Sequence, residues 1–218
     1  NVNLEPWCRD RASYNLRRAV HAKEEIPGDD LGPNYSFKPG FMWESGIAPL
    51  IPFAVRGAIW YQGESNAQSL EQITVHDELF PLLVRDWRTQ WQQGEFPFIF
   101  VQLPGMNRPH WPLVRDSQRR LLNDLPNTGM AVTIDLGDVN NVHPGDKRPV
   151  GDRLAQWALA EVYHKEVVIP SGPLIARVDF QADGKVKIHF DHTGGSLATV
   201  DKRPPRHFEV AGRNGHFQ

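Results

Sequence analysis

The stretch VRGAIWYQGESNA, residues 55–67, decides the fold that we expect. Its first half is an apolar run bounded by Gly57 and Gly63, which predicts a buried strand over residues 55–61. Polar side chains begin at Gln62, directly after that strand. In open α/β sheets, ligands bind at the carboxyl ends of the strands. The stretch therefore predicts both a sheet strand and a site at its end.

The same alternation continues downstream. Two more apolar runs, residues 96–103 and 129–135, predict buried strands. Apolar residues at spacings of three and four predict helices over residues 73–92, 112–122 and 150–163. Strands that alternate with helices through short connections form parallel sheets covered by helices. We therefore expect an α/β fold with three layers, in which helices flank a parallel sheet.

The two ends of the chain depart from this pattern. Upstream of the first strand, helices are expected over residues 11–25 and 42–50. Past the last helix the apolar pattern becomes alternating, and Asp183-Gly184 separates two short runs, which predicts a β-hairpin. The alternating runs are residues 176–180, 186–190 and 208–211. We expect an α/β domain over residues 1–170 and a β-rich segment over residues 171–218 that begins an accessory region.

Composition argues against several functional classes. The 218 residues carry a net charge of −2 with no long block of one sign, so we expect no nucleic-acid or membrane partner. No apolar run is long enough to span a bilayer. The single cysteine, Cys8, cannot form an internal disulfide and is interpreted as structural or incidental. The histidines show no metal-ligand spacing, and no phosphate-binding or dinucleotide motif is present, so we expect neither metal nor cofactor.

A second polar loop follows the third predicted strand. Residues 135–144 carry Asp138 and His143. If the strands are parallel, this loop and the loop that holds Gln62 and Gly63 open on the same edge of the sheet. Such a set suits acyl transfer: an imidazole acts as general base, a carboxylate orients it, and amide donors stabilise an oxyanion.

Each of these motifs also has a simpler interpretation. Glu64 could cap the following helix or pair with an arginine, and His143 could be incidental in its loop. The tryptophans also have two interpretations, as residues of a sugar-binding cleft or as residues of the core. Trp43 and Trp111 could line a sugar-binding cleft. The tryptophans expected in the core, because they lie on periodic apolar faces, are Trp60, Trp87, Trp91 and Trp157.

Residues 47–50 and 55–67 together resemble the sialate O-acetylesterase family, which are carbohydrate esterases of the SGNH-hydrolase superfamily. The stretch from Trp60 to Ala67 is the most specific part of this resemblance. Weaker matches follow in the family's order, over roughly residues 40–215 in all. They include Trp87-Arg88, Phe96-Pro97-Phe98, Arg115 with Gln118, His143-Pro144, Ser171-Gly172-Pro173 and Phe190-Asp191-His192.

The resemblance implies an SGNH/flavodoxin-like sheet domain over residues 1–170 that lacks its N-terminal part. It also implies a serine esterase that removes O-acetyl groups from sialic acids or other acetylated glycans such as xylan. It implies that Gln62 and Gly63 form the oxyanion hole and that His143 is the catalytic base. Glu64 and Asn66, in the same block as Gln62, are expected to bind the acetylated carbohydrate. It also implies a secreted or periplasmic location, although no signal peptide is visible. The oligomeric state and the particular sugar cannot be read from the sequence.

Two departures from the family pattern qualify this expectation. The family's nucleophile lies in a Gly-Gln-Ser-Asn-type motif that this chain lacks, and Ser65 lies in a different block. Asn140 and Asn141 stand where many relatives carry an Asp before the histidine, so we choose Asp138 as the orienting acid and Asp135 as the second candidate. We expect the serine to be encoded upstream and this chain to have little or no esterase activity. The alternative is a non-catalytic carbohydrate-binding pseudo-esterase.

Overall fold

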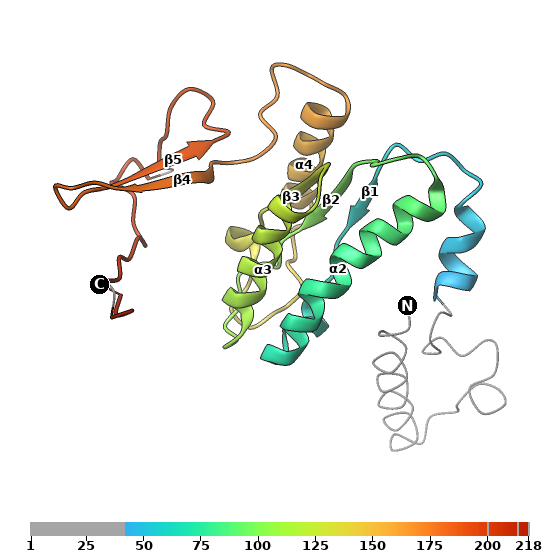
Figure 1. The fold of residues 1–218 in the computed structure, drawn as a ribbon, viewed down its shortest axis with the longest axis horizontal. Helices are drawn as coiled ribbons and strands as arrows, with labels where there is room; N and C mark the ends of the chain where they lie inside the picture. The colour runs from blue at the N-terminus through green and yellow to red at the C-terminus, as the bar shows by residue number, and fades with distance from the viewer. Residues whose placement is uncertain (1–41, 200, 213, 218) are drawn as a thin grey trace. The chain divides into compact units, whose positions relative to one another are not determined.

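The computed structural model describes residues 42–199, 201–212 and 214–217 (Figure 1). The helix predicted over residues 11–25, like Cys8, lies outside these residues. Two compact units are distinguished. The first holds the described residues up to Val55 together with Leu83–Glu95, and the second holds Arg56–Leu82 and Phe96–Gln218. The second unit contains every residue that the sequence predicts for the site.

The first unit is built around the second half of a long helix, α2 (Leu70–Trp91). The indole Nε1 of Trp91 donates a hydrogen bond of 3.1 Å to the carbonyl of Phe53. Gln93 binds both backbone groups of Val55, at 2.9 Å and 3.3 Å. The helix predicted over residues 42–50 is present as a π-helical turn, η1 (Trp43–Ile47), and a 3₁₀ turn, η2 (Ala48–Leu50). Pro49 falls in the first turn of η2, where its missing N–H costs nothing.

The second unit contains a parallel sheet, as the sequence predicts. Its strands are β1 (Ala58–Trp60), β2 (Phe98–Val101) and β3 (Thr128–Ala131), in the order β1-β2-β3. Both strand pairs are parallel. Every residue of the central strand β2 is buried, which explains its uninterrupted apolar sequence.

The strands are shorter than the apolar runs predicted, and the third is the clearest correction. A strand was expected to continue to Asp135, but β3 ends at Ala131 and Ile134–Leu136 forms a 3₁₀ turn, η4. Thr133 leaves the extended region with φ −134° and ψ 18°, and its buried hydroxyl donates a hydrogen bond of 2.5 Å to the carbonyl of Gln102. This side-chain bond replaces the next rung of the ladder, so the strand cannot continue.

Helices cover both faces of the sheet (Figure 1). Phe80 of α2 contacts the rings of Phe98 and Phe100 on one face, at centroid distances of 5.8 Å and 5.2 Å. Ile99, which points to the opposite face, packs against Trp157. Trp157 ends α4 (Arg148–Trp157), which η5 (Ala158–Val162) continues. The remaining helix, α3 (Trp111–Asp124), is tied to α2 by hydrogen bonds from Ser117 and Arg120 to Asp77.

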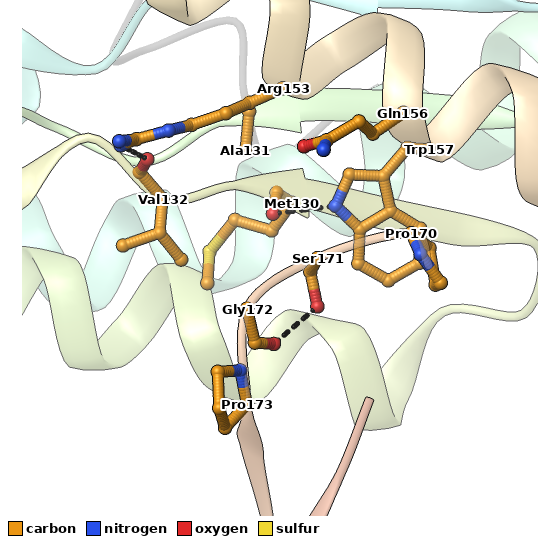
Figure 2. A pocket seen from close by; sticks show the side chains of 10 residues that line it. All are labelled: Met130, Ala131, Val132, Arg153, Gln156, Trp157, Pro170, Ser171, Gly172 and Pro173. Atoms are coloured by element: carbon orange, nitrogen blue, oxygen red, sulfur yellow. Dashed lines mark hydrogen bonds between the residues drawn. The ribbon is translucent and has the colours of Figure 1, made fainter. Parts of the chain in front are cut away.

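Side chains of α4 also close the outer edge of β3. Trp157 Nε1 donates a hydrogen bond of 2.8 Å to the carbonyl of Met130, and Arg153 donates one of 2.6 Å to the carbonyl of Val132 (Figure 2). The edge of a sheet presents unpaired carbonyls that can pair with another chain. Here two of those carbonyls are already bound, which protects this edge from further strand pairing.

The contact between Gly129 and Trp157 gives a stability prediction. A Cβ added at Gly129 would lie 2.6 Å from two atoms of the Trp157 ring, closer than real side chains approach. We expect Gly129→Ala to destabilise the protein by about 1–3 kcal/mol, because the indole must leave its place in the core. Gly145→Ala is the matched control, since nothing lies within 4 Å of its Cβ. Urea unfolding checks this, and equal midpoints for the two variants would contradict the packing described.

The predicted β-hairpin is present after the α/β part. Its strands are β4 (Leu174–Phe180) and β5 (Val186–Asp191), paired antiparallel around a turn in which Gly184 has φ 81°. Residues 208–211, whose apolar pattern also alternates, form no strand; among the described residues of the tail only a bridge between Ala211 and Phe217 is found. An isolated run of this length has no neighbour to complete its ladder. The division of the chain at residue 170 stays a prediction.

None of the described helices is both long enough and apolar enough to cross a membrane.

Candidate functional site

Three loops meet at the carboxyl edge of the parallel sheet. They follow β1, β2 and β3, and because the strands are parallel they emerge on the same side. Asn107 of the second loop donates a hydrogen bond of 3.1 Å to the carbonyl of Val139 in the third. Val142 of the third loop packs against a buried cluster that includes Ala67 from the first. The loops that carry Gln62 and His143 therefore share one edge.

Gly63 has a backbone conformation that only glycine adopts without strain. It is buried and has φ 149° and ψ −10°, directly before the 3₁₀ turn η3 (Glu64–Ala67). A Cβ at this position would meet Gln118 Nε2 at 3.4 Å and Leu103 Cδ2 at 3.5 Å. The neighbouring Gln62 uses one amide N–H to donate to Asn66 Oδ1 at 3.0 Å. The side-chain amide of Gln62 is thus oriented, and its second N–H has no acceptor among the described residues.

Helix α3 holds the end of β2 through two amide side chains. Gln118 is buried, accepts a hydrogen bond of 2.8 Å from the N–H of Leu103, and donates to the carbonyl of Val101 at 3.4 Å. Gln102 donates to the carbonyl of Arg115 at 3.1 Å. In the sequence, Gln118 stood out only through the family resemblance. The structure gives it a physical role, which is to fix the backbone against which Gly63 packs.

A pair of glycines joins the second loop to the third. A Cβ on Gly137 would run into the backbone of Gly105, and a Cβ on Gly105 would lie 2.5 Å from the carbonyl oxygen of Ile134. Side chains at either position would push the two loops apart. The loop that carries Asp138 and His143 is therefore positioned by direct contact between backbones.

The loop from Asp138 to Asp146 is shaped by short side-chain bonds to its own backbone. Asp138 accepts from the N–H of Asn140 at 2.8 Å, and Asn141 accepts from the N–H of His143 at 2.9 Å. Asp146 accepts from the N–H of Arg148 at 3.0 Å, at the start of α4. Such turns explain the density of Asp and Asn in this segment.

The structure does not bring the predicted base and its orienting acid together. His143 and Asp138 are both exposed, and within the described residues no hydrogen bond joins the imidazole to a carboxylate. Asp138 as the orienting acid stays a prediction.

Asp135, the second candidate acid, is bound to Arg153. Its two carboxylate oxygens accept hydrogen bonds of 2.6 Å each from the guanidinium. The hydrogen bonds from Arg153 are the main reason why the pKa of Asp135 lies below its ordinary value. The same bonds raise the pKa of Arg153. Arg153 also caps the end of β3, so this pair anchors the third loop to α4. The geometry favours a structural role for Asp135.

This ion pair predicts a pH dependence of stability. Because the folded-state pKa of Asp135 is lowered, the stabilisation is present at neutral pH and is lost as the pH falls through the ordinary carboxyl range and then through the folded-state value. Asp135 is 56% exposed, so solvent screening limits the effect to about 1 kcal/mol or less. We expect Asp135→Asn to lower the urea midpoint at neutral pH and to converge with the natural chain in acid. Asp152→Asn, which breaks a looser exposed pair of 3.8 Å, is the control.

Tyr61 and Lys147 link the first loop to the third, which the sequence did not reveal. The Lys147 ammonium lies 5.2 Å from the centroid of the Tyr61 ring, a cation–π contact. Burial, and secondarily the carboxylate of Glu64, raise the pKa of the Tyr61 hydroxyl. That hydroxyl is buried and has no hydrogen-bond partner among the described residues.

One of the two tryptophans that could have lined a sugar-binding cleft lies in the core instead. Trp111 is fully buried, and its Nε1 donates a hydrogen bond of 2.5 Å to the carbonyl of Pro104. It therefore cannot line a cleft. Trp43 is half-buried and belongs to the first unit. Of the tryptophans expected in the core, Trp91 and Trp157 are buried, whereas Trp60 and Trp87 are half-buried.

A cavity of about 330 Å³ lies beside the outer edge of β3 (Figure 2). Trp157 and Arg153 of α4 form one wall, and the segment from Pro170 to Pro173 forms another. None of the site residues predicted from the sequence lines this cavity. Within the described part of the chain, no group of three or more His, Cys, Asp or Glu residues is arranged to hold a metal ion.

Comparisons with known proteins agree on one family. A family model described as carbohydrate esterase, sialic acid-specific acetylesterase, matches residues 44–160. The human sialate O-acetylesterase is 32% identical over 235 residues, which covers 98% of this chain and 43% of that protein. The mouse sialate O-acetylesterase is 33% identical over 172 residues, which covers 69% of this chain and 31% of that protein.

A solved structure extends this likeness to the fold. A carbohydrate acetylesterase from Xanthomonas citri matches with a TM-score of 0.70 and 37% identity, over 79% of this chain and 40% of that one. The chain thus spans less than half the length of each of these relatives.

Proposed function

Because the chain belongs to the sialic acid-specific acetylesterase family of carbohydrate esterases, we propose that it supplies the oxyanion hole and the general base of a serine esterase. The substrates are O-acetyl esters of sialic acid or of other glycans. The observation that carries this proposal is the conformation of Gly63 beside the oriented amide of Gln62, at the carboxyl end of β1 and on the same sheet edge as His143.

The proposed reaction assigns a role to each of these groups. A serine hydroxyl attacks the acetyl carbon while His143 accepts its proton. The free amide N–H of Gln62 and the N–H of Gly63 donate to the oxyanion that forms. The sugar hydroxyl leaves with the proton from His143, and water then releases acetate and restores the serine. Asn66 orients Gln62, and Glu64 contacts the sugar.

In this proposal the serine comes from polypeptide outside these 218 residues. The contacts of two serines support this. The hydroxyl of Ser117 is bonded to Asp77. That of Ser171 donates to the carbonyl of Gly172 at 2.7 Å and lies 2.7 Å from Nδ1 of His192, but Ser171 lines the cavity beside β3, which neither Gln62 nor Gly63 lines. Ser65 is exposed one residue after Glu64, in the block that supplies the oxyanion hole and not in a strand-to-helix elbow of its own.

A second function, carbohydrate binding without hydrolysis, is favoured by one observation. The imidazole of His143 has no orienting carboxylate among the described residues, and a base without one is a weaker catalyst. In that case the chain would bind acetylated sugars at the same sheet edge. A secreted or periplasmic location goes with either function as a prediction.

Turnover of an aryl acetate separates these possibilities. We expect no hydrolysis above the uncatalysed rate from the pure 218-residue chain. Hydrolysis is expected from the full polypeptide of the natural gene, purified in the same way. Turnover by the 218-residue chain that is abolished in His143→Ala would overturn the proposal that the serine lies elsewhere. A full polypeptide that binds acetylated sialic acid without hydrolysing it would favour the binding function.

A further inference from the structure

Arg115 is a half-buried arginine of α3 that contacts the residues directly after the central strand β2. Its backbone carbonyl accepts from Gln102 at 3.1 Å, which fixes this turn of α3 against the end of the central strand. Its Nη1 faces the carbonyl of Pro104 at 3.5 Å, and Trp111 already donates to that carbonyl at 2.5 Å. The guanidinium is therefore held in place but only weakly engaged.

Among the described residues, no carboxylate pairs with Arg115. This sets it apart from its neighbours: Arg120 pairs with Asp116 at 2.6 Å, and Arg119 pairs with the same carboxylate at 2.8 Å. Arg153 binds Asp135 through two bonds. Burial lowers the pKa of Arg115, and no acidic group offsets that cost. A partly buried cation without a counter-charge is unfavourable, so the position fits an anion that comes from outside.

The guanidinium of Arg115 faces a segment that contacts both loops of the proposed reaction. Pro104, which its guanidinium faces, lies between Leu103 and Gly105 in the sequence. Leu103 contacts the position of Gly63, and Gly105 contacts Gly137 in the loop of His143. The guanidinium thus faces a carbonyl whose two sequence neighbours contact the proposed oxyanion hole and the loop of the proposed base.

We propose that Arg115 binds the carboxylate of an acidic sugar whose acetyl ester is presented to Gln62 and Gly63. A guanidinium presents a planar fork of donors that matches a carboxylate, whereas a neutral acetylated glycan offers no such group. Arg115 is then a specificity-determining residue that selects sialic acids over uncharged acetylated sugars. This inference rests on the proposed function for the placement of the acetyl group.

Ligand binding to the 218-residue chain tests the inference without hydrolysis. The probes are N-acetylneuraminic acid and its C1 methyl ester, which differ in the carboxylate charge. The reporter is the indole N–H resonance of Trp111, which shares its carbonyl acceptor with Arg115 and is assigned by its loss in Trp111→Phe. We expect the acid to bind more tightly than the ester by about tenfold or more.

Substitutions locate the source of that preference. Arg115→Gln is expected to bring the affinity for the acid down to that for the ester, and Arg115→Lys to keep part of the difference. Arg119→Gln, one turn further along α3, is the control and keeps the full difference. The urea midpoint of Arg115→Gln is expected to match or exceed that of the natural chain, because it removes an uncompensated charge.

Several results would overturn the inference. They are equal affinities of the natural chain for acid and ester, no binding of either, or an equal loss of both in Arg115→Gln. A large fall in stability in both Arg115 variants would likewise assign the residue a structural role. Failure of the full polypeptide to hydrolyse acetyl esters would overturn the proposed function and leave this binding test intact.

Discussion

Replacing His143 by alanine is expected to lower kcat/KM for acetyl esters by about 10²–10⁴-fold in a polypeptide that includes the serine proposed to lie outside these 218 residues. Without the imidazole, the serine has no group to accept its proton and the leaving sugar has none to supply one. The side chain is exposed and makes no hydrogen bond among the described residues, so its removal should leave the urea midpoint unchanged. Steady-state kinetics and unfolding of the same preparations check both points.

His216→Ala is the matched control, because His216 is also exposed and lies in the C-terminal tail. Its kinetics are expected to equal those of the natural polypeptide. If His143→Ala retained full activity, His143 would not be the base.

Gly137→Ala is expected to have the second largest effect. Its Cβ would collide with the backbone of Gly105, and neither backbone can yield as the end of a flexible side chain would. The loop that carries His143 must then move away from the loop after β2. A displacement of about 1 Å in a catalytic group can cost about 10²-fold in rate. We expect a loss of that order in kcat/KM, together with a lower urea midpoint.

Gly151→Ala provides the contrast. Gly151 is exposed within α4, and nothing lies within 4 Å of its Cβ, so alanine should stabilise the helix by about 0.5–1 kcal/mol and leave activity unchanged. Full activity in Gly137→Ala would show that the contact between the two glycines does not position the base.

The sheet could be predicted from the sequence because a strand that is buried on both faces has an uninterrupted apolar sequence. The residues of β2 are apolar throughout, and the helices after them keep an apolar spacing of three and four. The residue at which β3 ends could not be predicted from the apolar pattern. Thr133 is as compatible with a strand as its neighbours, and only its bond to Gln102, 31 residues away in the chain, ends the ladder. The predicted strand therefore ran on to Asp135.

The sequence places the candidate site residues after strands of the sheet, but it does not predict their contacts. Gln62, Gly63 and His143 stand out because each follows a strand, and a parallel sheet brings such positions to one edge. The importance of Gly137 depends on how closely another backbone approaches it. The unusual state of Arg115 depends on the absence of a neighbouring acid in the described structure, and a linear sequence that contains many acids cannot show that.

Labelling with a fluorophosphonate, which reacts covalently with activated serines, tests the central claim most directly. The account predicts that the full polypeptide takes up one label, on a serine that precedes Asn1, and that labelling is lost in His143→Ala. The 218-residue chain alone is predicted to remain unlabelled by intact mass. A label mapped by peptide sequencing to a serine within residues 1–218, such as Ser65, would contradict the claim that this chain supplies the base and oxyanion hole but not the nucleophile.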